Sequence, residues 1–379
     1  MGVKRVPEFE HSLLSLSNKI LADFFVEPLY KPLPIPWPRA RAVVLWTGDG
    51  LGRDVLQKVL EGDTLAFWKK RIQSSNGGVL PTDSVFPTTT ASALATLHFA
   101  VPPSVHGALG YTLWDPELLT TINVLSAQDL LGKVLPSTIY KHRKTIYDRS
   151  AANHVKSWVI SPASHSQSAF SQWVYHGALY CGYNSPSQIP GLVLSARKEE
   201  ARFIVVYWPG FDRVGHLEGK DSLAAKKNLK MLDQMLQASE EKIGKDAGVR
   251  FVLTSDHGLI DLYREQYTIP GIFSRPFVDE RRALYTDWNW IAMRRRLTRA
   301  GWHEALCVPV SQLWEEGYFG RVPADSRVLF RTLQSVIFPG DHQQLIMPGA
   351  EAPVMAAGHG GLTDQERQIF VSWWSISTQ

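Results

Sequence analysis

Three short apolar segments, each running directly into acidic or histidine residues, constrain this chain more than any other feature. They are RAVVLWTG (41–48), ARFIVVYWPG (201–210) and VRFVLTSDHG (249–258). Continuous apolar runs of this length are typical of strands buried on both faces of a parallel sheet. Residues 221–243 repeat apolar side chains at helical spacing and stop before Gly244. The order strand–helix–strand predicts a right-handed crossover, and hence an α/β fold with a mostly parallel central sheet flanked by helices on both faces.

Outside these segments the sequence divides into an N-terminal part and an insertion. Residues 10–25 carry apolar side chains at helical spacing and a proline-rich stretch follows, so residues 1–40 are interpreted as an N-terminal helix and linker. From 262 to 350, scattered prolines, arginines and tryptophans replace the apolar runs, which indicates a small inserted cap. The catalytic core would then comprise residues 41–261 and 351–379.

Composition indicates an ordinary soluble globular protein. The 379 residues are 44% hydrophobic and 20% charged, and a net charge of +4 argues against dedicated nucleic-acid binding. Cys181 and Cys307 lie far apart, which excludes a disulfide framework and a thiolate metal site. The first twenty residues contain no unbroken apolar stretch and the chain has no run of eighteen apolar residues. We therefore expect a cytoplasmic protein without membrane association.

The side chains that follow the buried runs are of the types that bind divalent metals. With one histidine between glycines near the C-terminus, they are Asp49, Asp212, His216, Asp256, His257 and His359. Each has an ordinary explanation by itself, since Asp-Gly after a strand is usually a turn and a glycine-flanked histidine can be a solvated loop residue. Together they would meet at the carboxyl ends of the strands, where ligands bind in an open α/β sheet. Six such donors could hold two metal ions, for which zinc is the first expectation and manganese or iron the alternatives.

The segment FPTTTAS (86–92) places three threonines in a row. A β-branched triplet is most often structural, because threonine packs well on a pleated surface. A threonine hydroxyl is protonated at neutral pH and needs a base or a metal to become a nucleophile. No GxSxG segment or paired Ser-His or Cys-His motif offers another nucleophile.

Two metal ions could activate a threonine hydroxyl as a nucleophile. The first would use Asp49, Asp256 and His257. The second would use Asp212, His216 and His359. Two metals about 4 Å apart can clamp the attacking and the leaving oxygen of an in-line displacement at phosphorus.

These motifs, in this order, resemble the alkaline phosphatase superfamily, and within it the nucleotide pyrophosphatase/phosphodiesterase branch, over residues 40–365. The matching pieces are Asp49-Gly50, a PTxT-like segment whose second threonine is Thr90, the turn His106-Gly107, Tyr207 with Asp212 and His216, then Asp256-His257, and His359. The resemblance implies that Thr90 is the nucleophile of a covalent phospho-threonine intermediate and a ligand of the first metal. It implies a turn role for His106.

Departures from the family pattern bear on the substrate. No arginine follows Thr90 in ASALATLHFA, so a dianionic monoester would lack the donor fork that alkaline phosphatases provide, and a diester suits the site better. Nucleotide-cleaving members place an aromatic residue after the nucleophile, where this chain has Ala91. They also place an asparagine on the phosphate where this chain has Tyr111, whose hydroxyl could donate a hydrogen bond to the substrate. We expect a small-molecule phosphate ester as substrate without assigning a nucleotide.

Several alternatives remain open from the sequence. The scaffold could serve a phosphomonoesterase, a phosphonate hydrolase or a non-catalytic binding protein, although the complete ligand set favours catalysis. The loop GDGLGR (48–53) lacks the third glycine of a dinucleotide site. Seven arginines within residues 275–299 could steer an anionic substrate or form a solvated face. Trp288 and Trp290 could form a stacking surface or pack inside the cap. Oligomeric state is not predicted.

Overall fold

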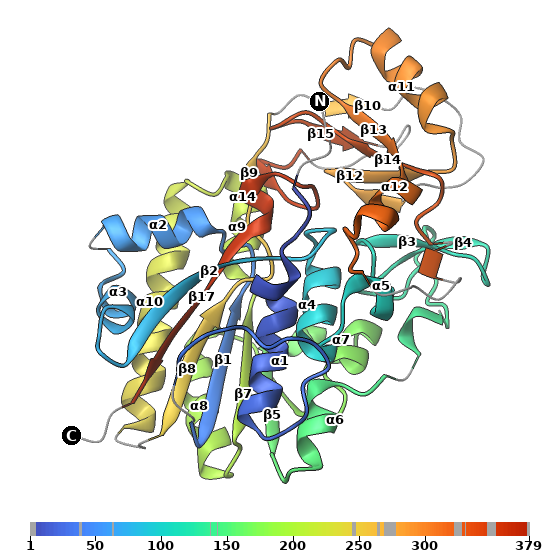
Figure 1. Ribbon diagram of the computed structural model, residues 1–379. Helices are drawn as coiled ribbons and strands as arrows, with labels where there is room; N and C mark the ends of the chain where they lie inside the picture. Colours follow the sequence, from blue (N-terminus) through green and yellow to red (C-terminus); the bar gives the residue numbers. More distant parts are fainter. Residues whose placement is uncertain are drawn as a thin grey trace.

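The computed structural model describes residues 5–37, 40–62, 64–136, 138–141, 143–244, 248–263, 266–268, 278–321, 328–329, 331–346 and 354–376. A seven-stranded sheet with the order β2-β17-β8-β1-β7-β5-β6 forms its centre (Figure 1). The strands are β2 (Gly77–Asp83), β17 (Gln368–Ser375), β8 (Val249–Thr254), β1 (Ala42–Gly48), β7 (Phe203–Trp208), β5 (Ser157–Pro162) and β6 (Leu179–Tyr183). From β8 to β6 all neighbours are parallel, and β17 runs antiparallel to β8 and β2. The predicted mostly parallel α/β fold is confirmed.

Helices cover both faces of this sheet (Figure 1). One face carries α1 (Leu13–Asp23), α4 (Thr90–Phe99), α6 (Ile146–Ala151) and α7 (Ala169–Val174), and the other carries α2 (Arg53–Glu61), α3 (Ala66–Ile72), α8 (Ile189–Lys198) and α10 (Leu223–Ile243). Strand β1 shows why the runs are continuously apolar. Val43 and Leu45 pack into the core under the first set of helices, whereas Val44 and Trp46 pack under the second.

The expected elements lie close to their predicted bounds, but several strands escaped the sequence reading. Helix α1 begins after Ser12, whose side chain accepts from the backbone N–H of Leu14, and α10 occupies most of the predicted 221–243. Strand β2 contains glycines and a proline and is only partly buried, so it lacks the apolar signature. Strands β5, β6 and β17 were also not predicted. Helix α1 packs against α4 in the main core.

A second, smaller sheet lies at one end of the core (Figure 1). It is antiparallel in the order β11 (Val278–Glu280), β12 (Ala283–Thr286), β14 (Ser335–Phe338), β13 (Leu306–Pro309), with α11 (Trp290–Arg299) and α12 (Val310–Glu316) beside it. Four-residue strands are too short to show a clear pattern, and for that reason the sequence predicted no elements here. Trp288 and Trp290 are partly buried against its apolar cluster, which favours the packing interpretation. The short strands β10 (Gln266–Thr268) and β15 (Gln344–Ile346) pair in parallel.

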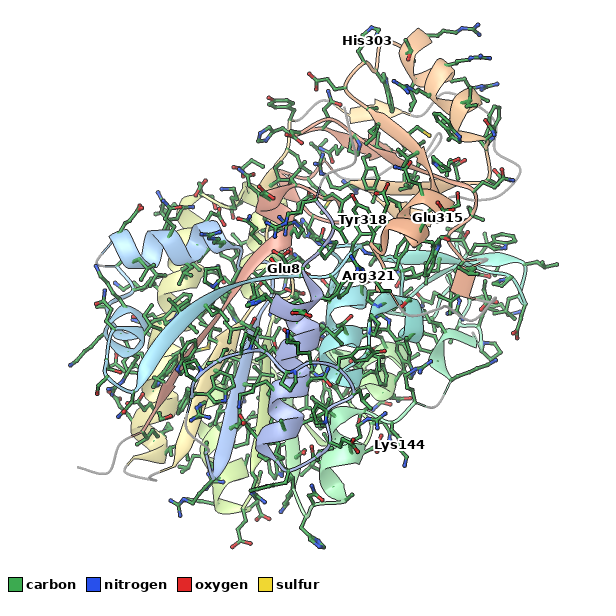
Figure 2. All side chains as sticks on the ribbon, viewed as in Figure 1. Glu8, Lys144, His303, Glu315, Tyr318 and Arg321 are labelled. Carbon is green, nitrogen blue, oxygen red and sulfur yellow. The ribbon has the colours of Figure 1, made fainter. Side chains whose placement is uncertain are left out.

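The smaller sheet is joined to the core next to the threonine segment. Phe86 packs against Tyr318, Phe319 and Phe338, with ring centroids 5.3–5.9 Å apart. Figure 2 shows Tyr318 and Arg321 at this junction, whereas His303 lies at the far end of the smaller unit.

The remaining short elements surround the sheet's edge. They are α5 (Pro103–His106), β3 (Thr112–Asp115), β4 (Thr120–Asn123), α9 (Gly210–Glu218), β9 (Ile260–Asp261), β16 (Ala357–Gly358) and α14 (Asp364–Arg367). Within the part of the chain that the structure describes, no helix is both long enough and apolar enough to cross a membrane.

Candidate active site

Parallel strands deliver the predicted ligands to one edge of the sheet. Asp49 directly follows β1, and Asp256 and His257 follow β8. Asp212 lies in the first turn of α9, immediately after β7, and His216 lies one turn further on the same helix. We call the six predicted ligands the rim cluster: Asp49, Asp212, His216, Asp256, His257 and His359.

His359 joins the rim cluster by a different route. It follows β16, which pairs antiparallel with β9, and β9 itself follows β8. The imidazole of His359 stacks on that of His257, with ring centroids 3.7 Å apart, and lies 5.2 Å from that of His216. A ligand about a hundred residues from its neighbours in sequence is therefore brought into place by a two-residue strand pair.

The three histidines share one orientation. Each Nδ1 faces a backbone carbonyl, at 2.8 Å from Ala357 O for His216, 3.2 Å from Gly258 O for His257 and 2.9 Å from Thr88 O for His359. A carbonyl oxygen only accepts, so each Nδ1 carries the proton and donates. Each Nε2 is then left with a lone pair, as in histidines that bind a metal while a carbonyl fixes the tautomer.

The lone pairs of the histidines face carboxylates. His216 Nε2 lies 3.1 Å from Asp212 Oδ2, and His359 Nε2 lies 3.7 Å from Asp212 Oδ1. His257 Nε2 lies 3.3 Å from Asp49 Oδ1 and 3.4 Å from Asp256 Oδ2. Among the residues described, Asp49 Oδ1, Asp212 Oδ1 and Asp256 Oδ2 are buried oxygens without a hydrogen-bond donor. Buried carboxylate oxygens without donors are costly unless a cation compensates them.

The pKa shifts of the three carboxyl groups reflect their burial and their mutual repulsion. Burial, with added repulsion from Asp256 and Asp212, raises the pKa of Asp49 well above its usual value. Burial and the charge of Asp212 raise the pKa of Asp256 to about 6. Burial also acts to raise the pKa of Asp212, but the imidazoles of His216 and His359 outweigh it and the net pKa is lowered. Three carboxyl groups so close together need positive charge to be ionised at once.

Burial shifts the histidines toward the neutral form in which they bind metals. It lowers the pKa of His257 to about 4 and, with repulsion from His257, that of His359 to about 3. Burial also acts to lower the pKa of His216, but the adjacent Asp212 carboxylate outweighs it and raises that pKa.

Two groups of donors are compact enough to hold a metal ion. In each, the donor atoms lie within 4.8 Å of one another: Asp212, His216 and His359 form one group, and Asp49, Asp212 and His257 form the other. The first is the second metal site expected from the sequence. In the other, Asp212 stands where Asp256 was expected, although Asp256 remains in contact with His257. The buried oxygens without donors and the neutral imidazoles fit two divalent cations.

The three consecutive threonines have three different roles. The Thr88 hydroxyl donates to Gly361 O at 2.9 Å and accepts from Gly360 N at 3.0 Å, so it holds the loop of His359. Thr89 is the N-cap of α4, with its side chain accepting from Ser92 N. Thr90 is the first residue of α4, and its Oγ1 lies 3.2 Å from His257 Nε2.

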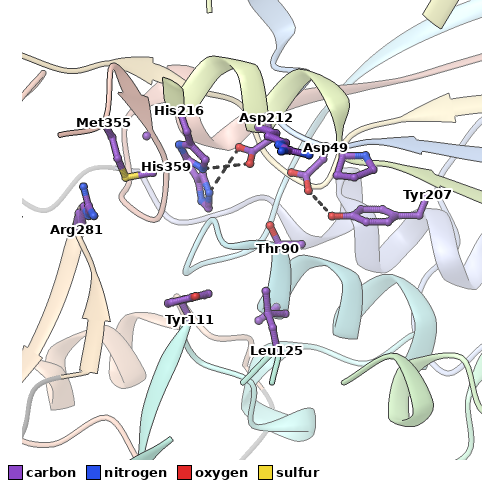
Figure 3. Close-up of a pocket in the computed structure, with 14 residues that line it drawn as sticks. Asp49, Thr90, Tyr111, Leu125, Tyr207, Asp212, His216, Arg281, Met355 and His359 are labelled. Atoms are coloured by element: carbon purple, nitrogen blue, oxygen red, sulfur yellow. Dashed lines mark hydrogen bonds and ion pairs between the residues drawn. The ribbon is translucent and has the colours of Figure 1, made fainter. Parts of the chain in front are cut away.

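A cavity of about 440 Å³ opens onto Thr90 and the rim cluster (Figure 3). Asp49, Asp212, His216 and His359 line it, together with Ala91, Leu125 and the predicted substrate contact Tyr111. The side chain of Tyr111 is exposed.

His106 stays apart from this site, as a turn residue would. It is buried, with Nε2 2.9 Å from Thr96 Oγ1 and Nδ1 accepting from Ala108 N at 3.1 Å.

Three further residues at the site were not assigned from the sequence. Tyr207 served there only as a motif position, but its hydroxyl donates to Asp49 Oδ2. Arg213 and Arg281 line the cavity. The position of Arg213 next to Asp212 was a signal that could have been read, whereas nothing local marks Arg281 among the arginines around it.

Comparison with solved structures finds proteins of similar fold. Murine ectonucleotide pyrophosphatase/phosphodiesterase 5 is similar in structure, with a TM-score of 0.65, 16% identity and 87% of each chain covered. An inactive variant of that protein with a threonine replaced by alanine, in complex with AMP, has a TM-score of 0.66 at 15% identity, over 88% of this chain and 87% of that one. The human ectonucleotide pyrophosphatase/phosphodiesterase 5 has a TM-score of 0.58 at 15% identity, over 87% of each chain. At such identities these likenesses show the fold.

Sequence comparison shows the family. No curated protein matches this chain significantly. Residues 43–305 match the profile of the type I phosphodiesterase/nucleotide pyrophosphatase family. The match spans well over half of the chain, so the protein belongs to this family of hydrolases acting on phosphoric ester bonds, within the alkaline phosphatase superfamily.

Proposed function

We propose that this protein hydrolyses a phosphate diester or anhydride through a covalent phospho-threonine at Thr90, with two divalent metal ions, zinc first among them. One observation carries the proposal: three donor-less carboxylate oxygens and three imidazole Nε2 atoms converge beside a single threonine hydroxyl. Two cations bound there would neutralise charge on the phosphate and lower the pKa of the hydroxyl.

The residues of the chain would have distinct roles in this reaction. Asp49, His257 and Asp256 would bind the cation beside Thr90, while Asp212, His216 and His359 would bind the other. Thr90 Oγ1 would attack phosphorus and displace the leaving oxygen, and water would then hydrolyse the threonine ester.

The same site supports a diester over a monoester. No arginine follows Thr90 along α4, so the second free oxygen of a monoester would meet no bidentate donor there. Tyr111 would donate to a phosphate oxygen from the cavity wall. A nucleotide is one candidate substrate, because a threonine-to-alanine variant of the murine relative is described as inactive and in complex with AMP.

The test compares bis-p-nitrophenyl phosphate with p-nitrophenyl phosphate, after bound metal per chain has been measured. We expect about two metals per chain and faster turnover of the diester. Thr90→Ala should lower diester turnover about a thousandfold or more, since a nucleophile cannot be replaced by its neighbours. Thr90→Ser, which keeps a hydroxyl, should retain part of it.

Thr298→Ala on the exposed face of α11 is the matched control and should behave as wild type. Full diester turnover in Thr90→Ala would contradict the proposal. Faster turnover of the monoester would favour the phosphomonoesterase alternative, and a phosphonate ester in the same assay tests the phosphonate hydrolase.

A further inference from the structure

We propose that Arg213 and Arg281 bind a negatively charged group carried by the leaving part of the substrate. This inference rests on the proposed function, because it assigns a leaving group to the attack by Thr90. It identifies the substrate class as a diester or anhydride whose leaving part retains its own carboxylate or phosphate.

The lining of the cavity is uneven. Ala91 and Leu125, both apolar, line it on the side of Thr90, and Arg213 from α9 and Arg281 each add a positive charge. Figure 3 shows Leu125 below Thr90, and Arg281 with Met355 beyond His216 and His359. A substrate that fills this cavity therefore meets apolar side chains near Thr90 and the positive charge of Arg281 beyond His216 and His359.

Arg281 is held in place by contacts with strand β15. Its Nη1 donates to Gln344 Oε1 at 3.2 Å, and Gln344 is completely buried. The Gln344 amide donates in turn to the carbonyls of Tyr263 and Met355, at 3.0 and 3.2 Å. Leu345 N also donates to Arg281 O at 3.0 Å. A guanidinium fixed by a buried amide is preorganised for a ligand, which lowers the entropy cost of binding.

Arg213 is the second guanidinium that lines the cavity. It follows Asp212 on α9, is exposed, and its side chain makes no hydrogen bond or ion pair with any residue in the ranges described. A guanidinium presents a planar fork of donors that matches a carboxylate or a phosphate. One guanidinium anchored by Gln344 and one exposed guanidinium line the same cavity, and an anionic group bound there would be attracted to both.

In-line displacement explains why this group would belong to the leaving part. The attacking and leaving oxygens lie on opposite sides of phosphorus. Thr90 approaches from the side of His257, so the leaving oxygen points toward Asp212, His216 and His359. Arg281 lies on that side, close enough to act electrostatically on His216.

The experiment uses two chromogenic diesters that differ by one carboxylate. Ethyl 4-nitrophenyl phosphate releases 4-nitrophenolate, and ethyl 3-carboxy-4-nitrophenyl phosphate releases the corresponding carboxylated nitrophenolate. We expect metal-loaded wild type to prefer the carboxylated ester in kcat/KM. The preference should fall about tenfold in Arg281→Gln and in Arg213→Gln, as expected for loss of a hydrogen bond to a charged group. Arg295→Gln, an exposed α11 residue outside this cavity, is the charge-matched control and should keep the preference.

Three results would overturn the inference. The first is equal kcat/KM for both esters in wild type, and the second is a preference that survives in the double variant Arg213→Gln/Arg281→Gln. The third is a preference that appears only for 4-nitrophenyl 2-carboxyethyl phosphate, which carries the carboxylate on the group that stays behind.

Binding to Thr90→Ala separates this inference from the proposed function. If the metal-loaded wild type hydrolyses neither ester, the proposed function fails, but the arginine site can still be tested by binding. Tighter binding of the carboxylated ester that is lost with Arg281→Gln would still support the arginine site, and equal affinities would refute it.

Discussion

Two clusters of buried charged side chains in this molecule differ in whether the chain compensates their charge. At the rim cluster, three carboxylate oxygens are buried without donors within the described part of the chain. At the junction of the smaller sheet with the core, Arg282 and Glu366 form what we call the junction pair, with Arg282 Nε 3.1 Å from Glu366 Oε1. Both clusters are buried, but only one is neutral and fully hydrogen-bonded.

The junction pair shows how many hydrogen bonds compensate a buried pair of charges. Arg282 Nη1 also donates to Gly340 O and Gln343 O, at 2.8 and 2.6 Å. Glu366 accepts from Gly361 N at 2.9 Å and from the Thr363 hydroxyl at 2.6 Å. Burial acts to raise the pKa of Glu366, but Arg282 outweighs it and lowers that pKa. The pair thereby ties the smaller sheet to the loop that carries His359.

The junction pair and the rim cluster therefore differ in the role of their buried charge. Where charge serves to hold the fold, the chain itself supplies every partner, as buried ion pairs require. At the rim cluster the described chain leaves such partners out, which costs stability unless cations bind there, as we propose.

Removal of metal should have the largest effect and tests the rim cluster directly. Dialysis against a chelator should lower diester turnover about a thousandfold, because bound cations contribute several kcal/mol to stabilising the transition state. It should also lower the thermal midpoint, since the cations bind only the folded protein. Added zinc should restore both. Full activity after verified metal removal would show that the rim cluster does not act through cations.

Breaking the junction pair should cost stability. Glu366→Gln leaves Arg282 buried without its counter-charge, and we expect a loss of about 3–5 kcal/mol in the free energy of unfolding, measured by denaturant titration. Glu8→Gln, which removes the exposed pair with Arg5, should leave the midpoint nearly unchanged. A loss no larger than that of Glu8→Gln would mean that the two clusters do not differ as described.

Removal of one charge from the rim cluster should instead raise the free energy of unfolding. In metal-free protein at pH 8, Asp256→Asn should raise the free energy of unfolding by about 1–3 kcal/mol, because it removes one of three repelling charges and its amide oxygen can still accept from Gly50 N. A carboxyl whose pKa is higher in the folded protein destabilises it above the unfolded pKa of about 4, and this cost grows until about pH 6. The gain should therefore fade as the pH is lowered from 6 to 4. Denaturant titrations at several pH values check this, and a loss at pH 8 would contradict it.

Tyr207→Phe should have the smallest effect. It removes the donor to Asp49 Oδ2 without changing the packing of the ring. We expect metal affinity to fall about tenfold, as for other partners that orient a ligand, with little change in stability. Competition with a chromophoric chelator measures this, and Tyr183→Phe, whose hydroxyl donates to the Tyr207 carbonyl away from the carboxylates, is the matched control.

Much of the site follows from local patterns. Asp49, Asp212 and Asp256 could be placed at the carboxyl edge because their strands are apolar on both sides, and such strands are recognisable without tertiary information. Thr90 was chosen among three threonines by resemblance to a family motif, since nothing local distinguishes it from Thr88 or Thr89. The short strands of the smaller sheet were missed because four residues carry too little periodicity.

By itself, the sequence determined the fold class and the set of side chains at the strand ends. Buried strands appear as continuous apolar runs, and the side chains at their ends follow directly in the sequence. Only the tertiary structure decided that Asp212 stands between the two donor groups and that His359 stacks on His257. It also decided that Arg281, from a distant segment, reaches the same cavity. These are relations between segments that lie far apart in the sequence, and they depend on strand pairing and packing that no local pattern records.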